Sequence, residues 1–283
     1  MKKGLLALLL LICSFFSVNA ATYYSYNAGG AGSYTFNTLS NWNTNRAGGG
    51  SNPGNFTTAN DIFVVQNGYT MTVTGASITF AAGAKLQIES GGNVISTNQI
   101  GFNATATFQI DNGGTYTHNN TSSWTNTLAG IESFGASSNV IIQATSTTGP
   151  GTPTTGWGNL SYTAIANMNM SGALTDASSS SGKSIQGNLS VSGNSMRLSG
   201  ATACTVTVGG NVTVSGSGML ALCTSSGLVT MNVNGNVNVT GGNLNVQLGN
   251  DNTNVKTLNI SGNLTISSGT FEYQTTGTSC NGV

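Results

Sequence analysis

The sequence repeats one short step, a Gly followed by an Asn, at nearly constant spacing through its C-terminal half. The four steps are Gly187-Asn188, Gly210-Asn211, Gly235-Asn236 and Gly262-Asn263. Apolar residues alternate with polar ones on both sides of the step, as in "TVTVGGNVTV" and "TMNVNGNVNV". Strict alternation over a short segment is typical of a β-strand. Equal units of this kind predict a solenoid in which each unit stacks on the one before it.

A second family of repeats occupies the N-terminal half. The segments "KLQIESGGNV" and "TFQIDNGGTY" match position by position, so that Leu86 aligns with Phe108 and Gly91 with Gly113. A period of 22–27 residues suits about three short strands per coil, joined by Gly, Asn and Ser corners. We therefore predict an all-β chain that forms a right-handed parallel β-helix. A β-sandwich also has short alternating strands, but it does not need equal units with one step at a fixed phase.

The Gly-Asn steps are expected to be the corners of the coils. Gly and Asn tolerate the left-handed backbone that a sharp corner can require. The corner amides should then stack and bond along the solenoid axis as a ladder of Asn188, Asn211, Asn236 and Asn263. Beyond each corner, a third alternating pair is expected to point inward, for example Met219 and Ala221 or Leu244 and Val246.

The composition agrees with short strands and tight turns. Gly (40), Thr (40) and Asn (36) make up 116 of 283 residues, whereas charged residues make up 5%. Five domain segments are predicted: a signal peptide (1–20), an N-terminal cap (21–60), a first β-helix block (61–144), a loop or joint (145–158) and a second β-helix block (159–283).

The first twenty residues have the pattern of a signal peptide. Lys2 and Lys3 precede an apolar run that is too short to span a bilayer comfortably, and small residues end at Ala20. We expect cleavage after Ala20 and a protein that is secreted or at the cell surface, with no later membrane segment. The mature chain has five basic and seven acidic residues, a net charge of 5 − 7 = −2. So few cations argue against nucleic acid as a partner.

Few residues suggest catalytic or metal chemistry, and we assign no catalytic, cofactor-binding or metal-binding residue and no cofactor. Glu89 and Asp111 are one repeat apart and could be neighbours on successive coils, although two solvated corner residues are the simpler interpretation. The single histidine, His118, lies in a polar run and is expected at the surface. Asp251 lies among Asn residues, which makes at most a weak calcium site.

The aromatic residues allow two interpretations. Sugars could stack on them, or they could pack into the cap, which is the commoner use. The residues concerned are Trp42, Trp124, Trp157, Tyr23, Tyr24 and Tyr26.

The mature chain has three cysteines. Cys204 and Cys223 are separated along the chain by somewhat less than one coil, so a disulfide between neighbouring coils is feasible in an extracellular protein. Cys280 then has no partner.

One stretch resembles a known group of proteins. The Asn41-Trp42 pair, Gln66-Asn67-Gly68 and the Gly-Asn corners are similar to the opening of secreted, repeat-rich β-helix proteins of gliding and related bacteria. The resemblance implies an adhesin-like surface protein exported by the type IX route. Such proteins usually end in a sorting domain, and none is visible before Val283, so we expect either a fragment or another export route.

The expected function is that of a secreted, non-enzymatic β-helix, an extracellular structural or adhesive module. Its partner would be an extracellular polysaccharide or a host or matrix surface. The main alternative is a carbohydrate-active β-helix enzyme, such as a polysaccharide lyase or hydrolase. Ice binding is a third possibility, but at the phase of Thr207 the next units carry Asn232 and Asn259, which breaks a threonine array.

Overall fold

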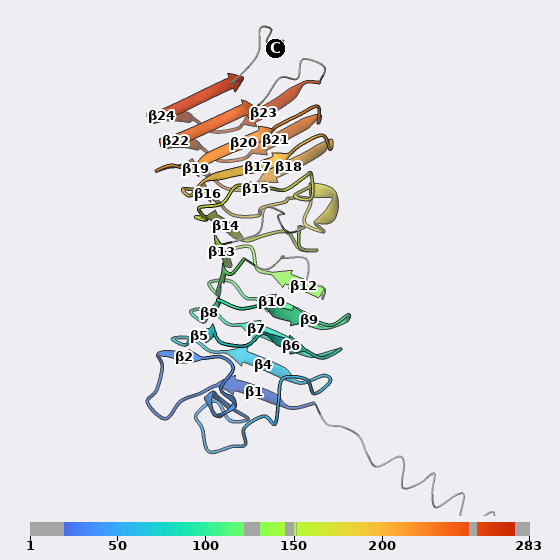
Figure 1. Cartoon of the computed structure of the whole chain (residues 1–283), viewed down its shortest axis with the longest axis vertical. Helices are drawn as coiled ribbons and strands as arrows, with labels where there is room; N and C mark the ends of the chain where they lie inside the picture. The colour runs from blue at the N-terminus through green and yellow to red at the C-terminus, as the bar shows by residue number, and fades with distance from the viewer. Residues whose placement is uncertain (1–19, 122–130, 145–149, 151, 249–253, 275–283) are drawn as a thin grey trace, which may run out of the picture.

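The chain folds into a parallel β-solenoid of about eight turns (Figure 1), which confirms the predicted fold class. The computed structural model describes residues 20–121, 131–144, 150, 152–248 and 254–274. Within these ranges the 3₁₀ turns η1 (Leu39–Asn41) and η3 (Asp176–Ser178) are the helical segments. No helix in the described part of the chain is long and apolar enough to cross a membrane.

One long sheet runs along the whole solenoid. Ten of its strands stack in parallel from one end to the other, each paired with the equivalent strand of the next coil. In order they are β2 (Ser33–Thr35), β5 (Thr70–Val73), β8 (Asn93–Ser96), β11 (Thr115–Asn119), β13 (Asn139–Ala144), β14 (Asn159–Tyr162), β16 (Leu189–Val191), β19 (Val212–Val214), β22 (Val237–Gln247) and β24 (Leu264–Gln274).

The long strand β22 continues around a corner, and this joins a second side of the solenoid to the same sheet. Its second half pairs with β20 (Met219–Cys223) of the preceding coil. On the same side, β20 pairs with β17 (Ser195–Ser199), and β17 pairs with β15 (Met168–Asn169).

Three further sheets complete the other sides. A six-stranded sheet contains β3 (Trp42–Asn43), β1 (Thr22–Ser25), β4 (Ile62–Val65), β7 (Lys85–Ile88), β10 (Thr107–Ile110) and β12 (Ile131–Phe134). A two-stranded sheet pairs β6 (Ile78–Phe80) with β9 (Ile100–Phe102). A three-stranded sheet contains β18 (Cys204–Val208), β21 (Val229–Val233) and β23 (Lys256–Ile260).

The core is made of columns of apolar side chains that stack from coil to coil. Because side chains alternate along a strand, every second residue points inward. One such column consists of Met71, Val94, Tyr116, Val140, Leu160, Leu189, Val212 and Val237, all with exposed fractions of 1% or less. Burying each of these side chains stabilises the fold by about 1.5–3 kcal/mol.

The corner glycines are required because a side chain would collide with the preceding coil. The predicted reason, a left-handed backbone, does not apply at the Gly-Asn steps. Left-handed backbone occurs at Gly91 and Gly113 in the N-terminal repeats, but not at the four Gly-Asn steps. At Gly210, for example, a Cβ would lie 2.4 Å from Oδ1 of Asn188 in the preceding coil. Gly187, Gly235 and Gly262 have the same close approach, at 2.3–2.5 Å. The glycine therefore leaves room for the amide of the coil before it.

The strand β20 is shifted by one residue from the predicted register, whereas the predicted pair Leu244 and Val246 of β22 is buried as expected. Leu220, not Met219, lies opposite Leu244, and the inward pair of β20 is Leu220 and Leu222. Leu220 comes six positions after Val214, whereas Leu244 comes five positions after Val239. One extra corner residue changes which side chains face inward because the period of a strand is two.

Residues 21–60 lie at the N-terminal end of the solenoid (Figure 1). Their aromatic side chains pack into the core of the first coils: Trp42 meets Phe36 and Phe63 edge-on, with ring centroids 4.7 and 5.3 Å apart. Phe56 also packs against Phe63, at 5.0 Å. This cluster covers the apolar end of the described stack of coils.

The segment 145–158 does not interrupt the long sheet. Strands β13 and β14, on either side of it, pair directly from Asn139↔Asn159 to Ile142↔Tyr162. On the opposite side the six-stranded sheet ends at β12, and the three-stranded sheet begins only at β18. On the remaining side the two-stranded sheet ends at β9, and pairing resumes only at β15, so the two predicted blocks share the long sheet but no other.

Candidate functional site

Two columns of side chains, outward-facing except for the buried Thr117, run along the ten stacked strands of the long sheet. The first, which we call the corner ladder, lies at or just before the start of each strand. It contains Ser33, Thr70, Asn93, Thr115, Asn139, Asn159, Asn188, Asn211, Asn236 and Asn263. The second, the outer column, lies two residues further on. It contains Thr35, Thr72, Ile95, Thr117, Ile141, Ser161, Ser190, Thr213, Asn238 and Thr265.

From Asn159 to Asn263 the corner ladder is hydrogen-bonded from coil to coil. The backbone N–H of Asn211 donates to Oδ1 of Asn188 at 2.8 Å, and that of Asn236 donates to Oδ1 of Asn211 at 2.8 Å. Asn263 repeats the bond to Asn236 at 2.9 Å. The predicted four-residue ladder is therefore present, but each amide accepts from the next backbone and not from the next amide. It also extends back through Asn159, whose Oδ1 accepts both from the Asn188 backbone N–H at 2.9 Å and from the Asn188 amide Nδ2 at 3.3 Å.

The outer column leaves its polar groups available. The side chains of Ser161, Ser190, Thr213, Asn238 and Thr265 make no hydrogen bond to any residue that the structure describes. Neither column contains a charged residue. With about 4.8 Å between strands, the ten positions span about 43 Å of uncharged surface. Such a face can make the same contact many times along one direction.

The three-stranded sheet repeats this arrangement on a smaller scale. Oγ1 of Thr207 accepts from Asn232 at 3.4 Å, and Oδ1 of Asn232 accepts from Asn259 at 2.9 Å, so this column is bonded internally. Two residues earlier, Thr205, Thr230 and Thr257 stand in register on successive strands. Their hydroxyls have no hydrogen-bond partner among the described residues.

The turn η3 closes one end of this sheet. Oδ1 of Asp176 accepts the backbone N–H of Thr207 at 2.9 Å and that of Ser184 at 3.0 Å, and Oδ2 accepts from the Thr207 hydroxyl at 2.6 Å. The carboxylate thus takes the place of a neighbouring strand, because the preceding coil pairs here only through an isolated bridge at Ile185. These bonds fix η3 beside β18.

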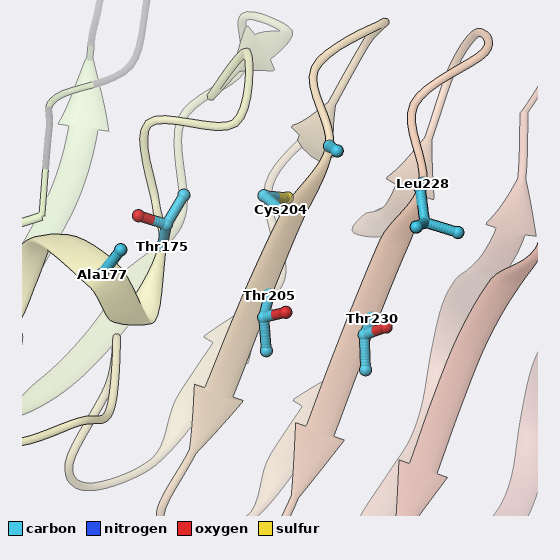
Figure 2. A pocket seen from close by; sticks show the side chains of 7 residues that line it. Thr175, Ala177, Cys204, Thr205, Leu228 and Thr230 are labelled. Carbon is cyan, nitrogen blue, oxygen red and sulfur yellow. The ribbon is translucent and has the colours of Figure 1, made fainter.

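A groove of about 430 Å³ lies between η3 and β21 (Figure 2). Figure 2 shows the side chains of Thr205 and Thr230 side by side on adjacent strands, with Leu228 further along. Leu228 is 51% exposed, which gives the groove an apolar rim. None of the seven lining residues is charged: Thr175, Ala177, Ala203, Cys204, Thr205, Leu228 and Thr230. The groove therefore offers hydroxyls and apolar surface together.

The predicted aromatic residues are used for packing. Trp42 and Trp157 are fully buried. Tyr23 stacks on Phe63 with ring centroids 5.3 Å apart, and the guanidinium of Arg46 lies 4.4 Å from the centre of the Tyr24 ring. Where the structure describes them, these rings favour the packing interpretation over sugar stacking.

The two carboxylates considered as an acid/base pair have separate partners. Glu89 forms an ion pair with Arg46. Asp111 accepts from the amides of Gln87 and Gln109, at 2.7 and 2.6 Å. Each carboxylate is thus held by neighbouring side chains, and the geometry gives no support to a shared catalytic role.

The prediction that His118 lies at the surface is wrong. The residue has no exposed surface, and its Nδ1 lies 3.3 Å from the hydroxyl of Tyr116. Burial lowers the pKa of His118 to about 4. The polar residues around His118 in the sequence suggested exposure. In the structure, however, the strand β11 carries both Tyr116 and His118 on its inner face. Among the described residues, no cluster of three or more His, Cys, Asp or Glu could hold a metal ion.

The structure holds Cys204 and Cys223 as free thiols, so it does not contain the disulfide considered from the sequence. Both are buried, and burial raises the pKa of Cys204. Sγ of Cys223 lies 3.0 Å from the carbonyl oxygen of Gly200 and 3.1 Å from that of Ser225. Trp124, Asp251 and Cys280 lie outside the described residues.

Known protein families, curated proteins and solved structures give no match to this chain.

Sequence reasoning missed three parts of these surfaces. The threonine array was sought at the position of Thr207. The aligned segments "TVT", "TMN" and "TLN" instead place Thr205, Thr230 and Thr257 at the same position of successive repeats. Sequence reasoning stopped the corner ladder at Asn188, although Gly158-Asn159 is a further Gly-Asn step. Nothing in the sequence indicated the groove, because η3 reaches β18 through a hydrogen bond between residues distant in the chain.

Proposed function

We propose that this protein is a secreted, non-enzymatic adhesive module that binds a neutral extracellular polysaccharide. One observation carries the proposal: on two faces, a column of available hydroxyl and amide groups stands in strict register beside a column that is bonded internally. The internally bonded column keeps the strands in register, and the neighbouring column remains free for a ligand.

The uncharged character of the faces favours a neutral ligand. An anionic polymer would require a row of cations, since charge neutralisation dominates such binding. Hydroxyl and amide groups instead exchange hydrogen bonds with water for hydrogen bonds with sugar hydroxyls, each with a small net gain. Five successive positions, from Ser161 to Thr265, let weak contacts add up along one polymer chain.

The groove suits a single sugar unit. The hydroxyls of Thr205 and Thr230 would bond to sugar hydroxyls, while Leu228 and Ala203 would cover an apolar face of the ring. Small-molecule sites commonly combine apolar walls with a few polar groups in this way. The proposal places the protein outside the cell, at the surface or in the matrix, as its N-terminal signal pattern and its resemblance to adhesin-like proteins of gliding bacteria suggest.

A glycan and matrix array tests the proposal, with the mature chain from Ala21 to Val283 as the probe. Product release from the same polysaccharides is measured in parallel. Binding to neutral glycans without turnover is the expected result. Release of unsaturated or reducing-end products would favour a carbohydrate-active enzyme instead. Binding of neither glycan nor matrix would contradict adhesion.

Matched variants locate the contact. Thr205→Val with Thr230→Val removes two groove hydroxyls while retaining shape and strand preference, and Ser190→Lys with Thr213→Lys places charge on the long face. Thr240→Val is the control, because Thr240 is exposed and lies outside both columns. We expect at least one double variant to weaken binding about tenfold, as the loss of about 1.4 kcal/mol would do, and the control to bind normally.

Ice binding is a second candidate, because the row of Thr205, Thr230 and Thr257 is more regular than the sequence suggested. A flat threonine row at constant spacing could order water in the same repeat. Thermal hysteresis of the mature protein tests this candidate directly. Hysteresis that the Thr205→Val and Thr230→Val changes abolish would replace the adhesive proposal for this face.

A further inference from the structure

Asp61 is a buried acidic residue without a cation beside it. The residue is 3% exposed, and its Oδ1 accepts a hydrogen bond from the backbone N–H of Ala21 at 2.9 Å. The ion pair that the described residues form is Arg46 with Glu89, elsewhere on the surface. A buried carboxylate is costly unless it is paired with a positive charge. Asp61 therefore lacks the positively charged partner that would offset the cost of burying its carboxylate.

No cationic side chain among the described residues is directed at this carboxylate. Lys85 lies on the neighbouring strand and donates its backbone N–H to the carbonyl oxygen of Asp61 at 2.8 Å. Its ammonium group instead donates to Oε1 of Gln109 at 3.2 Å. The other titratable group near Asp61 is Tyr23, whose pKa is raised by burial and, to a smaller extent, by the charge of Asp61.

Ala21 is held in a fixed position next to Asp61. Its carbonyl oxygen accepts the backbone N–H of Ile62 at 2.8 Å, while its own N–H meets the Asp61 carboxylate. The strand β1 then begins at Thr22 and pairs in parallel with β4. Among the described residues, the nitrogen of Ala21 is thus the first that donates a hydrogen bond, and it lies directly after the predicted cleavage point at Ala20.

We propose that Asp61 is the receptor for a new N-terminus, formed when a signal-peptide protease hydrolyses the Ala20–Ala21 bond. Water adds across the peptide bond: the leader gains a carboxylate at Ala20, and the mature chain gains an amine at Ala21 that takes up a proton at neutral pH. The resulting ammonium lies on Asp61 and forms the missing ion pair. The inference rests on the export that the proposed function assumes.

The geometry distinguishes this cleavage point from its neighbours. Cleavage one residue earlier would leave an uncharged amide at Ala21 and place the ammonium on the exposed Ala20. Cleavage one residue later would remove the carbonyl that bonds to Ile62 and the nitrogen that meets Asp61. Only an N-terminus at Ala21 supplies a positive charge at the carboxylate.

The first experiment determines the N-terminus of the exported protein. The full chain is expressed in a bacterium that processes signal peptides, and the protein recovered outside the cytoplasm is measured by intact mass and N-terminal peptide mapping. A mature chain that begins at Ala21 is the expected result. A mature chain with another N-terminus would overturn the inference but leave export intact. A chain retained in the cytoplasm with its leader would contradict both.

The second experiment tests the ion pair. Acylation of the α-amine by an activated ester at neutral pH should be about tenfold slower in the mature protein than in Asp61→Asn, because an ion pair keeps the amine protonated. A chain with one extra residue before Ala21 should react at the Asp61→Asn rate. Equal rates in all three proteins would overturn the receptor role.

Thermal unfolding gives a readout that does not depend on the Asp61→Asn variant being stable. The mature protein should have a higher unfolding midpoint than the same protein acetylated at its α-amine. The ion pair raises the amine pKa in the folded state, so the difference should be complete below about pH 7.7 and disappear as the pH rises through the folded-state pKa. A midpoint that acetylation leaves unchanged at pH 7 would contradict the ion pair.

Discussion

At the scale of single residues, the corner of each coil is a contact between a glycine and the amide of the coil before it. Sequence alone located this corner correctly, because the Gly-Asn step recurs with the period of the coil. It did not predict the physical reason. A left-handed backbone and a close approach between coils both select glycine, and only the three-dimensional structure distinguishes them.

We predict that Gly210→Ala lowers the free energy of unfolding by about 1–3 kcal/mol, as overpacking of a tight site does. The new Cβ would lie 2.4 Å from Oδ1 of Asn188 and 2.8 Å from the carbonyl oxygen of Gly187, so the corner bond would have to shift. Gly54→Ala is the control, since its Cβ would meet no atom within 4 Å. Urea unfolding followed by circular dichroism measures both. Equal stability of the two variants would contradict the steric explanation.

His118 should make stability depend on pH. Its folded-state pKa of about 4 is below the ordinary value of 6.5, so the unfolded chain binds the extra proton between these values. Stability from this residue is present above pH 6.5 and is lost as the pH falls toward 4. The stability advantage of the wild type over His118→Gln should shrink by about 2 kcal/mol between pH 7 and pH 5.

The pH dependence of wild-type stability alone cannot test His118, because Glu132 also contributes to it. Burial raises the pKa of Glu132 to about 8, so its contribution changes in the opposite direction over the same pH range. The two effects partly cancel in the wild type, but the difference between wild type and His118→Gln contains only the contribution of the histidine. A difference that does not change with pH would contradict the buried, neutral imidazole.

At the scale of elements, an acidic side chain replaces a strand at the end of the three-stranded sheet. Asp176 accepts four hydrogen bonds, two from Ser184 and two from Thr207, and so holds η3 beside β18. Hydrogen bonds to charged groups contribute more than neutral ones. This contact also forms one wall of the groove, so the position of η3 determines the shape of the candidate site.

Asp176→Ala should therefore release η3 without unfolding the solenoid. We expect a loss of about 2 kcal/mol, together with faster hydrogen exchange at the amides of Ser184 and Thr207. Thr205→Val is the matched control. Thr205 lies on β18, as Thr207 does, but its hydroxyl makes no hydrogen bond to a described residue. Hydrogen exchange measured by mass spectrometry over residues 175–184 and 204–208 compares them. Unchanged exchange in Asp176→Ala would show that other contacts hold η3.

The elements also show where prediction from sequence stops. Alternation correctly predicted which residues of β18 and β21 face inward, since Val206, Met231 and their neighbours are buried as expected. It failed at β20, where one additional corner residue moved Leu220 into the place given to Met219. Corner length sets the phase of the following strand, and Gly-rich and Ser-rich corners of different length look alike in sequence.

At the scale of the whole molecule, the repeat period was sufficient to predict a solenoid, because equal units can bury their apolar faces only by stacking. The candidate surfaces were less predictable. They depend on which outward side chains are already bonded, as Thr207 is and Thr205 is not. That distinction arises from contacts between different coils, including the contact of Asp176, which no local pattern records.

Because these faces are uncharged, we predict that the affinity of the protein for a neutral polysaccharide is nearly independent of salt concentration. Neither the corner ladder, the outer column nor the groove lining contains a charge, so screening has no attraction to weaken. Affinity should change less than about twofold when ionic strength rises from about 0.1 M to about 1 M, where the screening length falls from about 10 Å to about 3 Å. Sedimentation with an insoluble neutral glycan measures this. A steep loss of binding with salt would locate the contact among the few charged residues, such as Arg46 and Glu89, and would remove the ladder faces from the mechanism.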